Sequence, residues 1–238
     1  MSPLSRPAAV LFAAVLAFAL ASACDLAPST WPAFRDEPER IVAIGDLHGD
    51  LDKTRAALRL AGAIDLDDEW IGGDLVVVQA GDICDRGPYD RAIIDLFDRL
   101  APQAEAAGGA VRRVLGNHEY LNAVGTMDYV APGGFAAFYD FTGLYGEDPA
   151  LQAYPEPERP RRGAMRPGGP YAAILAEADV ALRVGRTVFV HGSLLPEHAE
   201  YGIERMSDET SAWLRGAAGA PPGPVSAIES PLTSRRYA

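Results

Sequence analysis

The side chains that could bind a ligand or take part in a reaction are most closely spaced in residues 81–88, which have the sequence Gly-Asp-Ile-Cys-Asp-Arg-Gly-Pro. This stretch follows an apolar run, 75–80, typical of a buried strand that ends in a turn. Asp82, Asp85 and Arg86 place two negative charges and one positive charge close together. Such crowding costs free energy unless a metal, an anion or partner side chains neutralise it. The sequence therefore predicts a ligand site at this turn.

Three other apolar runs also end in a turn that contains glycine and polar side chains. These runs lie at 41–44, 111–115 and 188–190. Open α/β sheets bind ligands at the carboxyl ends of their strands, and glycine lets the backbone turn sharply or approach a ligand closely. Four such ends in one chain are difficult to explain by turn chemistry alone. The side chains that they present are Asp46, His48, Asp82, Asn117, His118 and His191.

The elements that must position these side chains alternate between strand and helix. Residues 51–61 and 89–100 carry apolar side chains at helical spacing, and Gly62 and Pro102 are expected to end these two helices. Because the order is strand, helix, strand, helix, strand, the sequence predicts an α/β fold.

The segment 122–170 has no clear period and is rich in glycine, proline and aromatic residues. A connection of this length is usually a functional loop or a mobile segment, and short helices are expected near 133–141 and 171–178. A hairpin formed by 180–184 and 187–190 is predicted to follow it. The segment also holds a local basic cluster, which we interpret as a solvated loop rather than as a rim that attracts phosphate. The cluster consists of Arg159, Arg161, Arg162 and Arg166.

Taken together, the four turns resemble the first four motifs of the calcineurin-like metallophosphoesterases. Asp-Arg-Gly in the second motif resembles the same motif in the phosphoprotein phosphatase branch of the family. The segments 191–198 and 230–237 resemble the corresponding segments of bacterial Shewanella-like phosphatases. The resemblance covers roughly residues 40–238 and implies an α/β fold of the metallophosphoesterase αββα sandwich type. The motifs are GDLHGD at 45–50, GDICDRGP at 81–88, GNHE at 116–119 and VFVHGSLLP at 188–196.

The resemblance implies a site for two divalent metal ions. Asp46, His48 and Asp82 are implied to hold the first ion. Asn117 and His191 are implied to hold the second, with Asp82 bridging the two. This mixed set of oxygen and nitrogen ligands suits Mn, Fe or Zn better than Ca. In the family, a hydroxide shared by the two ions attacks phosphorus, so the implied activity is hydrolysis of a phosphoric ester.

Four further residues take part in catalysis by resemblance. His118 is implied to be the general acid that protonates the leaving alkoxide, and Asp85 is implied to orient its imidazole. Arg86 and Arg235 are implied to bind the phosphate oxygens, for which a planar guanidinium suits better than an ammonium group.

One motif of the family is absent from this sequence. Family members carry a later Gly-His motif whose histidine completes the shell of the second metal, whereas this chain has no histidine after His198. Two alternatives follow. The chain is a truncated fragment, incomplete at its C-terminus, or the second ion is held by three protein ligands and additional water.

Three functional hypotheses are therefore open. The first is a metal-dependent phosphomonoesterase acting on a phosphoprotein or a small phosphoester. The second is a hydrolase of the same fold that cleaves a dinucleoside polyphosphate or a phosphodiester. The third is a weakly active or inactive metal-binding remnant. The net charge of −12 argues against a nucleic-acid partner, whose binding surface would be basic.

The start of the chain has the composition of an export signal. Arg6 precedes a long apolar run, and small residues then lead to Cys24. We expect a signal peptide at 1–23 and a tether at 24–39, and hence an exported, periplasmic or cell-envelope protein. The small residues before Cys24 also resemble a bacterial lipobox, which would attach lipid to that cysteine. The alternatives are simple secretion after Ala23 and an uncleaved membrane anchor.

Overall fold

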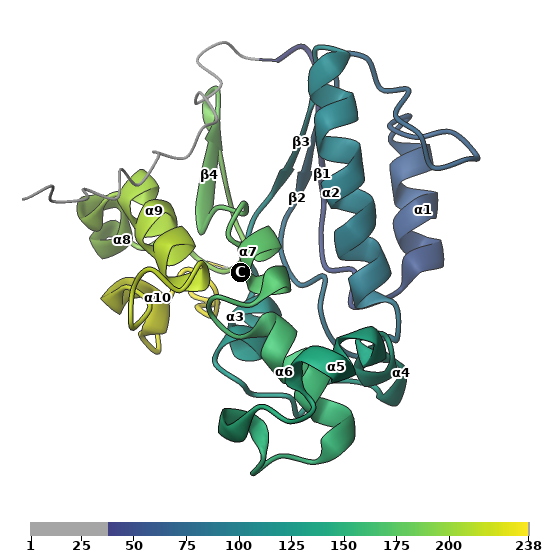
Figure 1. Cartoon of the computed structure of the whole chain (residues 1–238). Helices are drawn as coiled ribbons and strands as arrows, with labels where there is room; N and C mark the ends of the chain where they lie inside the picture. Colours follow the sequence, from purple (N-terminus) through teal and green to yellow (C-terminus); the bar gives the residue numbers. More distant parts are fainter. Residues whose placement is uncertain (1–37, 238) are drawn as a thin grey trace, which may run out of the picture.

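The computed structural model describes residues 38–237 (Figure 1). The predicted signal peptide, Cys24 and nearly all of the predicted tether lie outside the described residues. Within 38–237, no helix is both long enough and apolar enough to cross a bilayer. The first element, a strand, begins at Ile41.

Three parallel strands form the central sheet in the order β1-β2-β3. Ile44 pairs with Gln79, which pairs with Arg113, so the three strands end level at one edge. Helices α1 and α2 connect the strands and cover one face of the sheet (Figure 1). These elements and the next helix are β1 (Ile41–Ile44), α1 (Leu51–Leu60), β2 (Val76–Gln79), α2 (Asp90–Ala106), β3 (Ala110–Arg113) and α3 (Asn117–Ala123).

Helices α1 and α2 form where the apolar spacing predicts them. Asp50 caps α1 by accepting a hydrogen bond from the backbone N–H of Lys53. The expectation that Pro102 ends α2 is wrong, because the helix continues to Ala106 with the proline inside it. Proline removes one helical hydrogen bond, but Leu100 before it and Ala104 after it are both fully buried, so the helix packs in the core on both sides of the proline.

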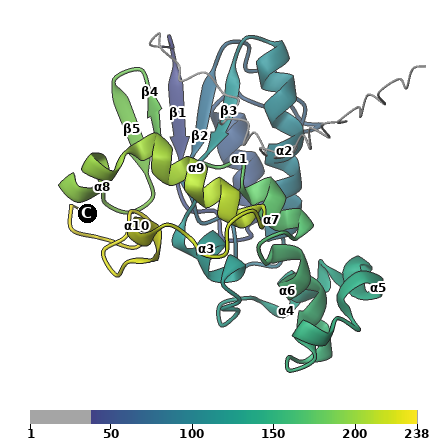
Figure 2. The same ribbon diagram turned by 60° about the vertical axis from the view of Figure 1, so that its left-hand side comes forward.

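The second face of the parallel sheet is covered by an antiparallel hairpin, β4-β5, at the positions that the sequence predicts. Leu182 and Val184 of the hairpin pack with Val76 and Val78 of β2 in a second apolar cluster. Figure 2 shows the hairpin beside the parallel strands. The predicted α/β sandwich is thus confirmed. The hairpin and the helices that follow it are β4 (Ala181–Val184), β5 (Thr187–Val190), α8 (Pro196–Tyr201), α9 (Ile203–Leu214) and α10 (Gly223–Ser226).

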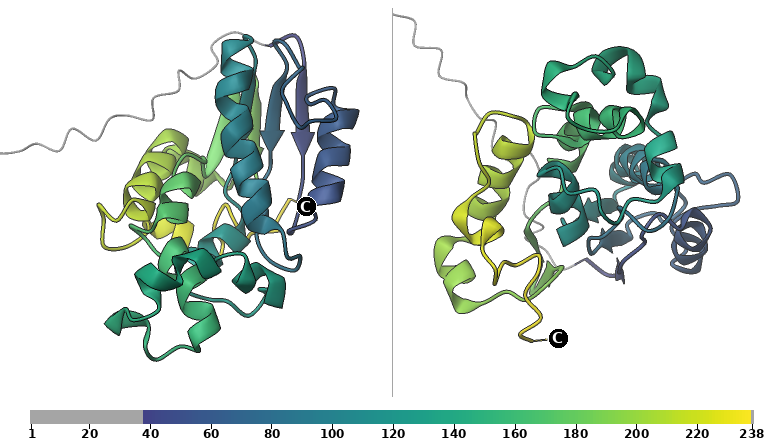
Figure 3. Two further views of the ribbon diagram at one scale, coloured as in Figure 1. Left: turned by 45° about the vertical axis from the view of Figure 1, so that its right-hand side comes forward. Right: turned by 90° about the horizontal axis from the view of Figure 1, so that it is seen from below.

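The segment 122–170 is a group of short helices rather than an open loop. Figure 3 shows them gathered beyond the carboxyl ends of the parallel strands. The interpretation of its arginines as a solvated cluster is wrong for Arg161, which is 0 % exposed. The helices in and after this segment are α4 (Pro132–Ala136), η1 (Tyr139–Phe141), α5 (Thr142–Tyr145), η2 (Pro149–Leu151), η3 (Glu156–Glu158), α6 (Arg159–Met165) and α7 (Pro170–Leu175).

Candidate active site

The turns after β1, β2, β3 and β5 meet at one place. The backbone N–H groups of Leu47 and His48 both donate to the carbonyl of Asp82, at 2.9 and 3.0 Å. Gly81 lies between the other turns: a side chain here would come within 2.7 Å of His191 Nδ1 and 2.8 Å of Gly116 Cα, and its φ is +96°. Only glycine permits this approach, so Gly81 lets the turns after β2, β3 and β5 come together.

Strained backbone is concentrated in the first two turns. His48, Asp82, Asp85 and Arg86 have φ values of 45°, 58°, 73° and 65°, in the left-handed region that disfavours residues with a side chain. Each costs on the order of 1–3 kcal/mol and persists only when the surroundings hold it in place, as they commonly do at ligand sites.

The side chain of Glu119 supplies much of that restraint. Its two carboxylate oxygens accept hydrogen bonds from the backbone N–H groups of Asp82, Cys84 and Gly116, at 2.9, 2.9 and 2.8 Å. Glu119 is 3 % exposed, so these charge-assisted bonds form away from water. One carboxylate therefore fixes the turn after β2 against the start of α3.

Two of the site histidines have the tautomer of a metal ligand. His48 Nδ1 donates to the carbonyl of Cys84, and His191 Nδ1 donates to the carbonyl of Ala80, both at 2.9 Å. A neutral imidazole that donates from Nδ1 carries its lone pair on Nε2. Histidines that bind metals commonly donate their other nitrogen in this way, which fixes the ring and leaves the ligand nitrogen free.

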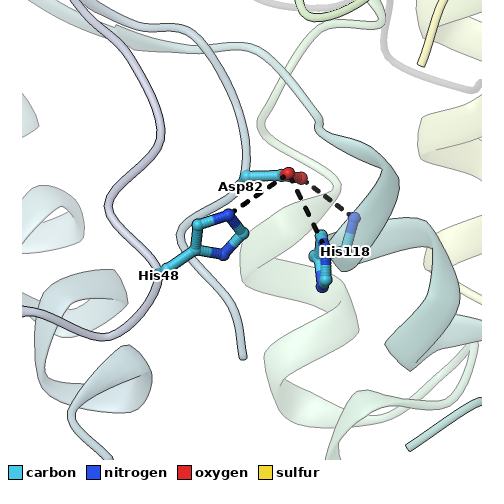
Figure 4. A group of neighbouring side chains, drawn as sticks. All are labelled: His48, Asp82 and His118. Atoms are coloured by element: carbon cyan, nitrogen blue, oxygen red, sulfur yellow. Dashed lines mark hydrogen bonds and ion pairs between the residues drawn. The ribbon is translucent and has the colours of Figure 1, made fainter. Parts of the chain in front are cut away.

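The Nε2 atom of His48 is buried and has no hydrogen-bond partner. It faces Asp46 Oδ2 at 3.5 Å and Asp82 Oδ2 at 3.7 Å and forms a hydrogen bond with neither carboxylate. Figure 4 shows the ring of His48 directed at Asp82. A buried polar atom without a partner is costly. A divalent cation between these oxygens and this nitrogen would satisfy it.

A second group of ligand atoms shares Asp82. His191 Nε2 lies 3.3 Å from Asp82 Oδ2 and 3.1 Å from Asn117 Oδ1. Burial lowers the pKa of His191, but its hydrogen bond to Asp82 and the charge of that carboxylate outweigh burial, so the pKa is raised. In the protein without metal, a proton on Nε2 can therefore be shared with the two oxygens that face it, Asp82 Oδ2 and Asn117 Oδ1. A cation could take the place of that proton.

The residues present therefore fit a centre for two divalent ions. The ligand atoms of His48, Asp82 and His118 lie within 4.8 Å of one another, as do those of Asp46, Asp82 and His191. Both groups share Asp82, and their carboxylate and imidazole donors suit Mn, Fe or Zn. All five predicted ligands, including Asn117, are thus brought close together.

His118 differs from the other two histidines in its Nδ1 partner. Its Nδ1 lies 2.7 Å from Asp85 Oδ2, and both side chains are buried. Its Nε2 faces Asp82 Oδ2 at 3.9 Å (Figure 4), so distance alone allows it to bind metal. However, a carboxylate partner stabilises positive charge on an imidazole, which a carbonyl does only weakly. This pairing favours a proton donor over a ligand.

The other oxygen of Asp85 has two partners that the sequence did not reveal. Asn122 Nδ2 donates to Asp85 Oδ1 at 2.9 Å, and Arg161 Nη2 lies 3.3 Å from the same oxygen. A signal for Asn122 did exist, because it lies four residues after His118 on one helix face. Arg161 is brought in by tertiary packing and carries no comparable local signal.

The two predicted phosphate-binding arginines are exposed at this site. Arg86 follows Asp85 directly, and its backbone N–H donates to the carbonyl of Tyr129 at 2.9 Å. Arg235 Nη2 lies 3.4 Å from His191 Nε2. The ring of Tyr129 meets that of His118 edge-on at 5.1 Å, so this exposed tyrosine is also part of the rim.

Two relatives of this chain are named as Shewanella-like protein phosphatases. Over 210 residues the chain is 40% identical to Shewanella-like protein phosphatase 2 of Arabidopsis thaliana, covering 77% of this chain and 54% of that protein. It is 31% identical to Shewanella-like protein phosphatase 1 of Plasmodium berghei, covering 65% and 39%. The chain thus spans about half the length of the first of these relatives, and less of the second.

Among solved structures, the cold-active protein-tyrosine phosphatase of a psychrophilic Shewanella species has a similar fold. The TM-score is 0.60 at 22% sequence identity, over 82% of this chain and 56% of that one. The calcineurin-like phosphoesterase family model matches residues 39–229. Since this match spans most of the chain, the protein belongs to the calcineurin-like phosphoesterase family.

Proposed function

We propose that the protein is a metal-dependent phosphomonoesterase and that its substrates are phosphoproteins. The observation that carries the proposal is the buried pair of His118 and Asp85, 2.7 Å apart, beside ligand atoms that converge on Asp82. The phosphoprotein class is supported by the names of the relatives, which are protein phosphatases.

The proposed metal ligands follow from the distances between the donor atoms around Asp82, with His118 kept as the proton donor. Asp46, His48 and Asp82 hold one divalent ion. Asn117 and His191 hold the other together with Asp82, and the ions are Mn, Fe or Zn. When bound, such ions activate water and neutralise the charge of a phosphoryl group.

The remaining work is done by side chains of this chain. His118 Nε2 is directed to the same carboxylate that the metal ligands share, so a phosphate ester there can receive its proton on the leaving oxygen. Asp85 holds the imidazole through Nδ1. Arg86 and Arg235, both exposed at the rim, bind the phosphate oxygens that point outward.

Hydrolysis of a phosphodiester or a dinucleoside polyphosphate is the competing activity. A monoester of a protein hydroxyl leaves as an alkoxide or phenoxide, which needs a proton, and the His118–Asp85 pair is built to supply one. The pair therefore favours an ester over a dinucleoside polyphosphate, whose leaving phosphate needs no proton. The names of the relatives, which are protein phosphatases, favour the monoester over the diester.

Purified chain supplied with Mn, Zn or Fe(II) tests the proposal against p-nitrophenyl phosphate, bis-p-nitrophenyl phosphate, a dinucleoside tetraphosphate and phosphopeptides. We expect metal-dependent release of phosphate from the monoester and from phosphopeptides. Asp82→Asn is the matched inactive control. Faster cleavage of the diester or the dinucleotide would contradict the proposal, and no metal-dependent rate on any ester would support an inactive remnant.

We also propose that the protein is exported and anchored by lipid at Cys24. The support is the sequence of the first residues alone, with small side chains before that cysteine. Mass spectrometry of protein from membranes should find a lipidated Cys24 at the N-terminus. Release after Ala23 without lipid would indicate simple secretion.

A further inference from the structure

Arg161 on α6 is the largest fully buried side chain in the part of the chain that the structure describes. A guanidinium cannot lose its charge, so burying it is costly unless it is paired and hydrogen-bonded. Arg161 has both kinds of partner. Its Nη2 lies 2.7 Å from Asp90 Oδ2, and its Nη1 donates to the carbonyl of Gly134 at 3.1 Å.

The second carboxylate in reach of Arg161 is Asp85, the partner of His118. Arg161 Nη2 lies 3.3 Å from Asp85 Oδ1, while Asp85 Oδ2 is 2.7 Å from His118 Nδ1. Both side chains of this ion pair are 0 % exposed. The guanidinium therefore holds one oxygen of the carboxylate, which leaves the other directed at the imidazole.

Arg161 also sets the orientation of the amide of Asn122. Its Nε and Nη2 both donate to Asn122 Oδ1, at 3.0 and 2.8 Å. The amide nitrogen of Asn122 must then face the other way, where it donates to Asp85 Oδ1 and to the carbonyl of His118, both at 2.9 Å. Arg161 thus contacts the acid pair, His118 and Asp85, in two ways: directly at Asp85, and through the side chain of Asn122.

A third connection restrains the backbone. Asp90 Oδ2, which pairs with Arg161, also accepts a hydrogen bond from the backbone N–H of Asp85 at 3.3 Å. Asp85 has a φ of 73°, a conformation that must be held by its surroundings. The backbone and the side chain of Asp85 are therefore both tied to one buried cation.

We propose that Arg161 is a positioning residue for the proton donor, fixing Asp85 and Asn122 so that the His118 imidazole stays directed at the reacting phosphate. This rests on the proposed phosphatase function, in which His118 is the general acid. It assigns a role to the helical segment between α3 and β4: that segment carries the cation that completes the acid pair.

The first test observes the imidazole without requiring activity. In protein labelled with ¹⁵N-histidine, the buried Nδ1–H of His118 should give a downfield proton signal that exchanges slowly, identified by its absence in His118→Asn. We expect Arg161→Met to abolish or broaden this signal. Arg162→Met removes the neighbouring charge, which pairs with Glu158 instead, and should leave the signal intact.

The second test uses the leaving group. Phenyl phosphate needs a proton on its leaving oxygen, whereas 2,4-dinitrophenyl phosphate departs as a stable anion. Arg161→Met should lower kcat on phenyl phosphate by about 100-fold, near the lower end of what general acid catalysis supplies. Its kcat on dinitrophenyl phosphate and its metal content should stay close to those of wild type and of Arg162→Met.

Arg161→Lys covers the case in which the methionine variant does not fold. Lysine keeps the charge but lacks the planar set of donors that reaches Asp85 and Asn122 together. We expect a smaller loss that is again confined to phenyl phosphate. An unchanged His118 signal in folded Arg161→Met, equal losses on both esters, or wild-type behaviour of Arg161→Lys would overturn the proposal. If wild type cleaves neither ester while its His118 signal still depends on Arg161, the proposed function fails and the positioning role stands.

Discussion

At the scale of single residues, the partner of Nδ1 separates the three histidines of the site. His48 and His191 donate to backbone carbonyls, whereas His118 faces the carboxylate of Asp85. In the proposed function, the first arrangement leaves Nε2 available to a metal, and the second places a carboxylate behind the imidazole that donates the proton.

His118→Asn should therefore lower kcat on phenyl phosphate by about 10²–10⁴-fold, the usual contribution of general acid catalysis. Its metal content should equal that of wild type, because no ligand is lost. His48→Asn is the matched comparison and should lose metal. Both quantities are measured by steady-state kinetics and elemental analysis of the same preparations. Loss of metal from the His118 variant would show that this histidine is a ligand.

At the scale of elements, the site depends on how the turn after β2 is tied to α3. Glu119, in the first turn of α3, binds three backbone N–H groups of the neighbouring turns. A neutral amide at this position would keep only one acceptor oxygen and would place an NH₂ group against a backbone donor.

Glu119→Gln should accordingly lower the free energy of unfolding by about 2 kcal/mol, the cost of leaving a buried donor unsatisfied. It should also weaken metal binding, since Asp82 would be held less firmly. Glu69→Gln changes an exposed carboxylate that pairs with Arg99, and should cost less than about 1 kcal/mol. Urea unfolding of both variants checks this. Equal stability of the two would contradict the role of Glu119.

The strand ends were predictable from sequence because their signal is local. An apolar run followed by Gly-Asp, Gly-Asn or His-Gly is visible within ten residues, and the structure places all four turns together. Pro102 misled the prediction because the helix continues past it, with Leu100 and Ala104 both packed in the core. Arg161 could not be predicted, since the carboxylates that balance its buried charge, Asp85 and Asp90, are distant in the sequence; Asp85 lies 76 positions away.

At the scale of the whole molecule, the parallel sheet and the hairpin are joined at Asp179. Its backbone carbonyl accepts from Leu115, and its N–H donates to Arg113, just before β4 begins. Burial raises the pKa of its side chain to about 6, although the charge of Arg112 opposes this.

Because the folded pKa of Asp179 lies above its ordinary value of 3.8, the folded protein binds the extra proton between these two values. The contribution of Asp179 to stability is thus greatest below about pH 4 and falls as the pH rises towards about 6. Asp179→Asn removes this dependence. Relative to wild type, the variant should gain at most about 3 kcal/mol of unfolding free energy between pH 4 and pH 7. A stability difference that does not change with pH would contradict the buried, titrating carboxyl.

The central claim is that separate turns hold two divalent ions through the shared carboxylate of Asp82. Elemental analysis after equilibrium dialysis against Mn or Zn tests it most directly. Wild-type protein should retain two ions per chain, and Asp82→Asn, which has nearly the same volume, should retain fewer than one. Two tightly bound ions in the Asp82 variant, or only one ion or fewer in wild type, would contradict the account.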